Sequence, residues 1–164
     1  IAHCPSSNLR LGSGIAPVRA LLDAGAPVGL AVDGSASNDA SNLLLEARMA
    51  MLVQRVKAGV AAMPARDVWW LATRGGAAVL GRDDIGSLEI GKAADLALFD
   101  VSGLAYAGAQ SDPLAALLFC GFDQRAWMTI VNGRIVVKEK QLVTGDEALI
   151  AETANAAAAQ LIAQ

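Results

Sequence analysis

The sequence predicts an α/β fold in three parts: the end of an α/β barrel or doubly wound sheet over residues 1–82, a small β unit over 83–143, and a C-terminal helix over 144–164. Three observations support this. An apolar strand, a helix and a second apolar strand follow one another at the N-terminus, which is a βαβ unit. The pattern changes from helical to β near residues 82–85. Hydrophobic residues make up 54% of the 164 residues, which is high for a free-standing domain of this size.

The first elements alternate between apolar strands and a helix. Residues 1–4 are expected to end a strand, and residues 5–8 to form a polar loop. Apolar positions at helical spacing predict a helix over residues 15–24, which Gly25 ends. Residues 27–32 form a continuous apolar strand, a pattern typical of a parallel sheet that is covered on both faces.

Helices dominate the next part of the chain. A loop of small and polar residues over 34–41 precedes a helix over 42–57, in which Glu46 is expected to be solvated or salt-bridged. Pro64 begins another helix. Gly75 and Gly76 are expected to interrupt it before a short helix over 77–80.

The remaining elements are mainly strands. Residues 94–100 predict a strand, and Asp112-Pro113 begins a helix that runs to Phe119. Strands over 127–131 and 134–137 are joined by Asn132-Gly133, which favours a type I′ hairpin turn. The run from Thr144 to Glu147 has the spacing of a capping box and begins the last helix.

Composition excludes several classes of protein. The net charge of −3 and the absence of a basic stripe argue against nucleic acid or an anionic membrane as the main partner. Uncharged apolar runs are shorter than the ~18–20 residues of a membrane span. Two cysteines, Cys4 and Cys120, predict reduced thiols in a cytoplasmic protein. The excess of apolar residues predicts burial in a larger fold or in a homo-oligomer, and the opening Ile1-Ala2-His3 predicts a chain that continues upstream.

Asp33 is the first candidate for chemistry. It directly follows an apolar parallel strand, and active sites of barrels and open α/β sheets form at that end of the strands. A carboxylate in this place can bind a metal or act as a base. The alternative for Asp33 is a helix N-cap or an ordinary loop aspartate.

His3 also ends an apolar strand, thirty residues before Asp33, so the two side chains are expected to face one mouth. The alternative is a core histidine that is hydrogen-bonded to backbone. Ser35 and Asn38 follow Asp33 and offer neutral hydrogen-bonding groups for a small polar ligand, or ordinary loop contacts. One His and one Asp are too few for a zinc site, so any further ligands are expected outside this stretch.

Four stretches together resemble the amidohydrolase superfamily, in its cytosine-deaminase-like and chlorohydrolase-like branch. Residues 2–14 resemble the end of the seventh barrel strand, and residues 28–38 the eighth. Residues 86–95 are similar to the return into a β-sandwich, and residues 131–137 to its closing hairpin. Within the superfamily, the nearest resemblance is to bacterial 8-oxoguanine deaminases, carried by the segments DGSASND (33–39), MAMLVQRV (49–56) and DPLAAL (112–117).

The resemblance implies the C-terminal portion of a (β/α)8 metal-dependent hydrolase barrel, followed by part of a β-sandwich and a helix. It implies hydrolytic deamination of an amino-substituted purine- or pyrimidine-like heterocycle, with 8-oxoguanine first and hydroxyatrazine-type or guanine/cytosine-type substrates as alternatives. One divalent metal is expected, zinc first and iron second. Asp33 would bind it and move protons, while His3, Ser35 and Asn38 would contact the substrate.

The family's other metal ligands, which include a His-x-His pair, have no match in this sequence. The 164 residues are therefore not expected to be active alone. The rival interpretations are a catalytically inactive scaffold of the same fold and a small binding module.

Overall fold

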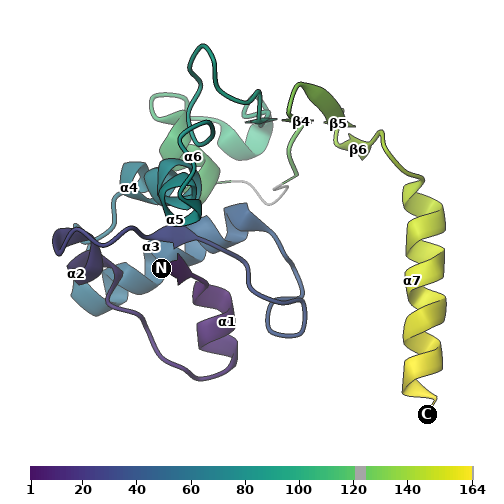
Figure 1. The fold of residues 1–164 in the computed structure, drawn as a ribbon, viewed down its shortest axis with the longest axis horizontal. Coiled ribbons are helices and arrows are strands. Elements are labelled where there is room, and N and C mark those ends of the chain that lie inside the picture. Colours follow the sequence, from purple (N-terminus) through teal and green to yellow (C-terminus); the bar gives the residue numbers. More distant parts are fainter. Residues whose placement is uncertain (121–124, 164) are drawn as a thin grey trace. The chain divides into compact units, whose positions relative to one another are not determined.

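The computed structural model describes residues 1–120 and 125–163, which fall into two compact units. Among these residues, the first unit takes in 1–92 and 101–120, and the second takes in 93–100 and 125–163. Figure 1 shows the order of the elements along the chain. The predicted domains 1–82, 83–143 and 144–164 stay predictions.

The first unit contains the predicted parallel pair of strands. β1 (Ala2–His3) pairs with β2 (Gly29–Leu30) in parallel, with Ala2 opposite Gly29 and His3 opposite Leu30. The βαβ prediction is confirmed, but each strand is shorter than expected. The fold of this unit is mixed α/β, and two strands do not close a barrel.

Between these strands lie two helices, of which the sequence predicted one. α1 (Pro5–Arg10) replaces the polar loop expected over residues 5–8, and that prediction was wrong. Pro5 occupies the first turn, where its fixed φ favours a helix and its missing N–H costs nothing. α2 (Val18–Asp23) begins later than expected, because Pro17 disfavours helical backbone at the residue before it.

α3 (Leu43–Ala58) forms the centre of the first unit, as predicted. Asn42 caps it: the side-chain oxygen accepts hydrogen bonds from the N–H groups of Leu44 and Leu45, at 2.9 and 3.1 Å. The helix packs against α1, β2, α4 and α6 (Figure 1). Its inward face carries buried apolar side chains: Leu44, Ala47, Ala50, Met51 and Val53.

The helix that follows is continuous through its glycines, so the predicted interruption was wrong. α4 (Ala65–Trp70) passes into a π-helical turn, η1 (Leu71–Gly75), and then into α5 (Gly76–Leu80). A Cβ atom at Gly75 would lie 2.3 Å from the carbonyl oxygen of Val28. These glycines therefore allow β2 to lie directly against the helix backbone.

α6 (Pro113–Phe119) completes the first unit, as predicted. Asp112 caps it by accepting a hydrogen bond from Ala115 N at 3.0 Å. Arg48 of α3 donates to the carbonyl oxygen of Leu118 at 2.5 Å, near the C-terminus of α6. A short 3-10 helix, η2 (Leu104–Tyr106), precedes it.

The second unit is an antiparallel sheet of order β3-β4-β5-β6. Its strands are β3 (Leu96–Leu98), β4 (Met128–Val131), β5 (Arg134–Lys138) and β6 (Gln141–Leu142). Asn132 and Gly133 both have positive φ, +46° and +79°, which confirms the predicted type I′ turn. β6 was not predicted, because Glu139 and Lys140 form its turn with positive φ and without glycine.

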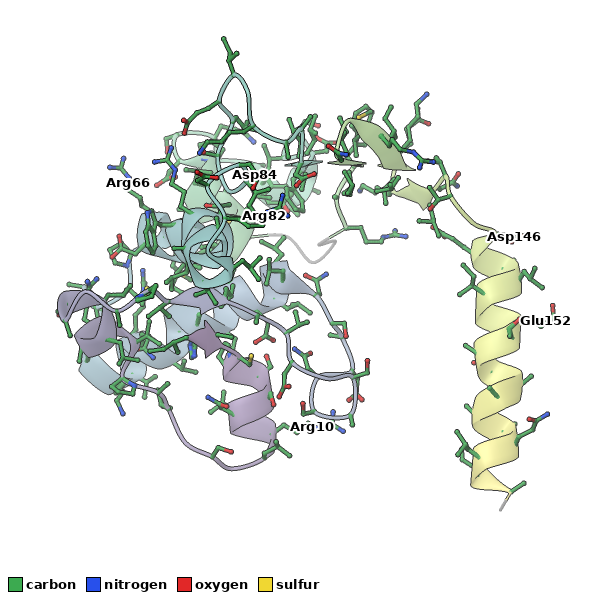
Figure 2. All side chains as sticks on the ribbon, in the orientation of Figure 1. Arg10, Arg66, Arg82, Asp84, Asp146 and Glu152 are labelled. Carbon is green, nitrogen blue, oxygen red and sulfur yellow. The ribbon has the colours of Figure 1, made fainter. Side chains whose placement is uncertain are left out.

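α7 (Glu147–Ile162) follows this sheet, and no residue of it is buried. Its N-cap is Asp146, which stands at the start of the helix in Figure 2 and accepts hydrogen bonds from Ala148 and Leu149 N. The predicted capping box at Thr144 is therefore wrong. Glu147 accepts instead from Leu142 N, at 2.7 Å.

Among the helices that the structure describes, none has the length and hydropathy needed to cross a membrane. The cytoplasmic location and the homo-oligomer stay predictions.

Candidate functional site

α1, which follows β1, and the loop after β2 meet at one edge of the parallel pair. His3 is the last residue of β1, and Asp33 lies three residues beyond β2. Parallel strands end at the same edge, so the segments that follow them are neighbours. Ser7 of α1 donates a hydrogen bond to Asp33 Oδ2 at 2.5 Å, which joins α1 directly to the segment after β2.

Asp33 is an exposed carboxylate that two hydroxyl groups hold in place. Oδ2 accepts hydrogen bonds from Ser7 Oγ at 2.5 Å and from Ser37 Oγ at 3.1 Å. These bonds, above all that from Ser7, together with a backbone hydrogen bond from Gly34, lower the pKa of Asp33 below its usual value. The carboxylate is therefore ionised at neutral pH. Because Asn42 caps the next helix, the N-cap alternative for Asp33 was wrong.

His3 is buried, with 3% of its surface exposed. Neither Nδ1 nor Nε2 has a hydrogen-bond partner among the described residues. Burial lowers the pKa of His3, and the negative charge of Glu46 opposes that effect in part. Since buried polar groups are as a rule hydrogen-bonded, this neutral ring is able to bind a group that the described residues do not supply.

Asn38 and Ser35 occupy different places in the loop that follows Asp33. Asn38 is buried, and its amide donates to Val32 O at 2.8 Å and to Glu46 Oε1 at 2.9 Å. Both amide hydrogens are thus used inside the protein, which leaves the side-chain oxygen for a substrate. Ser35 is exposed in the turn that follows Asp33.

Glu46 is a residue that sequence reasoning placed wrongly. It is 1% exposed, and its carboxylate accepts hydrogen bonds from Ser6 N and from Asn38 Nδ2. It is therefore neither solvated nor salt-bridged, among the residues described here. A signal was present in the sequence: Glu46 shares one face of α3 with Ala50 and Val53, both of them buried.

This site offers one protein ligand for a divalent metal ion. Across residues 1–120 and 125–163, no group of three or more His, Cys, Asp or Glu side chains is placed to hold a metal ion. A zinc site normally needs at least three protein ligands. The exposed, ionised carboxylate of Asp33 fits one of them.

An ion pair at the surface also links the segments that follow β1 and β2. Arg10, labelled at the end of α1 in Figure 2, forms an ion pair with Asp39 in the loop after β2. Both side chains are largely exposed, so the pair contributes little to the free energy of folding. It nevertheless joins the same two segments as the bond between Ser7 and Asp33.

Comparison with known proteins gives matches over nearly the whole chain. The amidohydrolase family matches residues 1–136. The chain is 51% identical over 164 residues to the 8-oxoguanine deaminase of Pseudomonas aeruginosa, covering 99% of this chain and 36% of that protein. It is 41% identical over 163 residues to the 5-methylthioadenosine/S-adenosylhomocysteine deaminase of Pelotomaculum thermopropionicum, covering 99% and 37%.

A solved structure also matches. The crystal structure of the atrazine chlorohydrolase of Arthrobacter aurescens TC1, complexed with zinc, superposes with a TM-score of 0.89 at 40% sequence identity. The match covers 95% of this chain and 35% of that one. The chain thus spans little more than a third of the length of the relatives that it matches.

Proposed function

Because this chain belongs to the amidohydrolase family, we propose that it supplies two neighbouring strand ends of a barrel whose activity is metal-dependent deamination. The proposed substrate is an amino-substituted purine- or pyrimidine-like heterocycle, with 8-oxoguanine first. The 51% identity to an 8-oxoguanine deaminase supports that choice. The 40% identity to an atrazine chlorohydrolase supports a triazine as the alternative ring.

The observation that carries the proposal is the fixed carboxylate of Asp33. It is ionised, exposed and held by two serine hydroxyls at the end of a parallel strand. Neither hydroxyl adds charge, so the carboxylate keeps its full negative charge for a cation or a proton. The proposed metal is zinc, with iron as the alternative, and its further ligands would come from elsewhere in the full-length protein.

Each group at this edge would have a separate role. A bound divalent metal lowers the pKa of water, so that hydroxide is available near neutral pH. Asp33 would accept the proton released from the attacking water and deliver it to the amino nitrogen, which leaves as ammonia. The neutral His3 ring would hydrogen-bond to the heterocycle, and Ser35 and Asn38 would orient its polar edge.

The test is ammonia release by the metal-loaded, full-length protein with 8-oxoguanine, isocytosine and hydroxylated triazines. Asp33→Asn should lower kcat by about 10²–10⁴-fold with little change in KM, because an amide cannot accept the proton. Asp39→Asn is the matched control, since Asp39 is an exposed aspartate of the same loop and pairs with Arg10. Its kcat should match that of the wild type.

Two results would overturn the proposal. The first is that Asp33→Asn keeps more than about a tenth of the wild-type kcat, far above the general-base expectation. The second is that the wild-type protein releases ammonia from none of the three substrate classes, which would favour the inactive scaffold.

A further inference from the structure

Glu46 is a buried charge for which the proposed reaction has no use. Only 1% of its surface is exposed. Within the described part of the chain, no Lys or Arg forms an ion pair with it. Removing a carboxylate from water is costly unless hydrogen bonds replace the water molecules. The partners of Glu46 therefore indicate what its burial achieves.

Both oxygens of Glu46 accept hydrogen bonds, and each bond comes from a different strand-end segment. Oε2 accepts from Ser6 N at 3.0 Å, in the helix that follows β1. Oε1 accepts from Asn38 Nδ2 at 2.9 Å, in the loop that follows β2. Glu46 itself belongs to α3, so one side chain ties three segments together.

The bond to Asn38 leads to the backbone of Asp33. The same amide nitrogen of Asn38 donates to Val32 O at 2.8 Å, one residue before Asp33. Asp33 has a φ of +66°, a left-handed conformation that is uncommon for residues other than glycine, although aspartate adopts it more readily than most. The link from Glu46 through Asn38 helps to hold the chain in that conformation.

The bond to Ser6 leads to the side chain of Asp33. Ser6 is the neighbour of Ser7, whose hydroxyl donates to Asp33 Oδ2 at 2.5 Å. Glu46 therefore fixes the backbone beside the donor of this bond and, through Asn38, the backbone beside its acceptor.

We propose that Glu46 is a positioning residue, which holds Ser7 and Asp33 together and so sets the affinity of the site for its metal ion. The proposal rests on the proposed function in one respect, since it takes Asp33 as a metal ligand.

Two acceptor oxygens are essential to this role. A carboxylate presents acceptors only, whereas an amide presents one acceptor and one donor. In Glu46→Gln the side-chain NH₂ group must face either Ser6 N–H or the amide of Asn38. In either orientation a donor faces a donor, although shape and volume are kept, so one of the two ties is lost.

The experiment measures metal affinity by chelator competition, together with kcat and KM, in the metal-loaded full-length protein. Glu46→Gln should weaken metal binding by about 10- to 100-fold and lower kcat, with KM little changed. Gln54→Leu is the matched control: Gln54 is equally buried in α3 but donates to Ala16 O, away from the strand ends. It should lower thermal stability and leave metal affinity unchanged.

A double mutant separates positioning from general damage. Asn38→Ala alone should weaken metal binding, because it breaks the link to Val32. Adding Glu46→Gln to Asn38→Ala should lower the metal affinity little further. The Asn38 amide that would face the glutamine NH₂ group is gone, and the glutamine oxygen can still accept the hydrogen bond from Ser6 N. Strict additivity of the two effects would overturn the proposal.

Further outcomes distinguish this inference from the proposed function. If Asp33→Ala loses the metal while Glu46→Gln and Asn38→Ala retain it fully, the positioning role is wrong and the proposed function stands. If Asp33→Ala retains the metal, the ligand role of Asp33 is wrong, and the inference falls with it. If Glu46→Gln does not fold, Asn38→Ala decides: unchanged metal affinity in that variant refutes the proposal.

Discussion

At the scale of single residues, the two hydroxyls on Asp33 differ in environment. Ser7 is 1% exposed and its bond is 2.5 Å long, whereas the Ser37 bond is 3.1 Å long and exposed. Water can replace an exposed hydroxyl, but a buried one leaves its partner short of a hydrogen bond. The structure thus indicates that Ser7 supports Asp33 more strongly than Ser37 does.

We expect Ser7→Ala to weaken metal binding by about 10- to 100-fold in the full-length protein, and Ser37→Ala to weaken it less. Chelator competition on both variants checks the ranking. An equal or larger loss in Ser37→Ala would show that the buried hydroxyl is not the main support of Asp33.

His3 gives a second prediction at this scale, on stability against pH. Burial lowers the pKa of His3 in the folded state, so as pH falls through about 6.5 the unfolded chain takes up a proton before the folded one does. The unfolded state then binds more protons, and the free energy of unfolding decreases as pH falls.

As pH falls below about 6.5, the free energy of unfolding of the wild type should therefore decrease relative to that of His3→Gln. The decrease should be at most about 1.4 kcal/mol per pH unit. Denaturant unfolding of the two full-length proteins between pH 7.5 and 5 measures it. A difference that stays constant with pH would contradict the burial effect.

Position in sequence was enough to place His3 and Asp33 at the ends of two parallel strands, which share an edge. It was not enough for Glu46. An acidic residue in a helix is most often solvated, and only the packing of α3 against α1 and the loop after β2 shows that its carboxylate faces Ser6 and Asn38.

At the scale of elements, β2 and the residue before it lie close to the backbone of the helix α4-η1-α5. A Cβ at Gly29 would lie 2.8 Å from Gly76 Cα, and a Cβ at Gly75 would lie 2.3 Å from Val28 O. A Cβ at Gly76 would lie 3.9 Å from Leu71 O, which is an ordinary van der Waals contact. Glycine is thus required at two of the three positions.

Gly75→Ala should destabilise the full-length protein by about 1–3 kcal/mol, because β2 must move away from the helix. Gly76→Ala is the control, and should be neutral or stabilising by up to about 1 kcal/mol, because alanine favours helices. Denaturant unfolding of both variants measures this. Equal stability of the two would refute the close contact.

The same contact explains why the predicted helix interruption at Gly75 and Gly76 was wrong. Paired glycines usually end a helix, and from the sequence Gly75-Gly76 predicted a break. The helix continues because glycine has no side chain to keep β2 away. The packing of β2 against the helix then stabilises the helical backbone at these flexible residues.

At the scale of the whole molecule, the chain leaves much apolar surface uncovered. The sheet of β1 and β2 has two strands in the described residues, whereas parallel sheets are normally wide and buried on both faces. Large apolar side chains are exposed as well, among them Leu11, Val56, Val60 and Leu80. Such edges and patches favour association.

Residues 1–164 expressed alone should therefore aggregate or remain molten, because these strand edges and apolar side chains are exposed in the described residues. Size-exclusion chromatography, thermal unfolding and binding of an apolar dye measure it. A monomer with a sharp thermal transition would contradict the expectation and favour the small binding module.

The sequence by itself determined the parallel βαβ unit, most helices, the Asn132-Gly133 hairpin and the strand-end places of His3 and Asp33. Each follows from local chemistry: periodicity, caps, turn residues or the direction of a strand. Only the tertiary structure decided that Gly75 continues a helix and that Glu46 joins α1 to the loop after β2. The reason is that both depend on contacts between segments far apart in sequence, and no local pattern specifies which backbone or which donor will lie opposite.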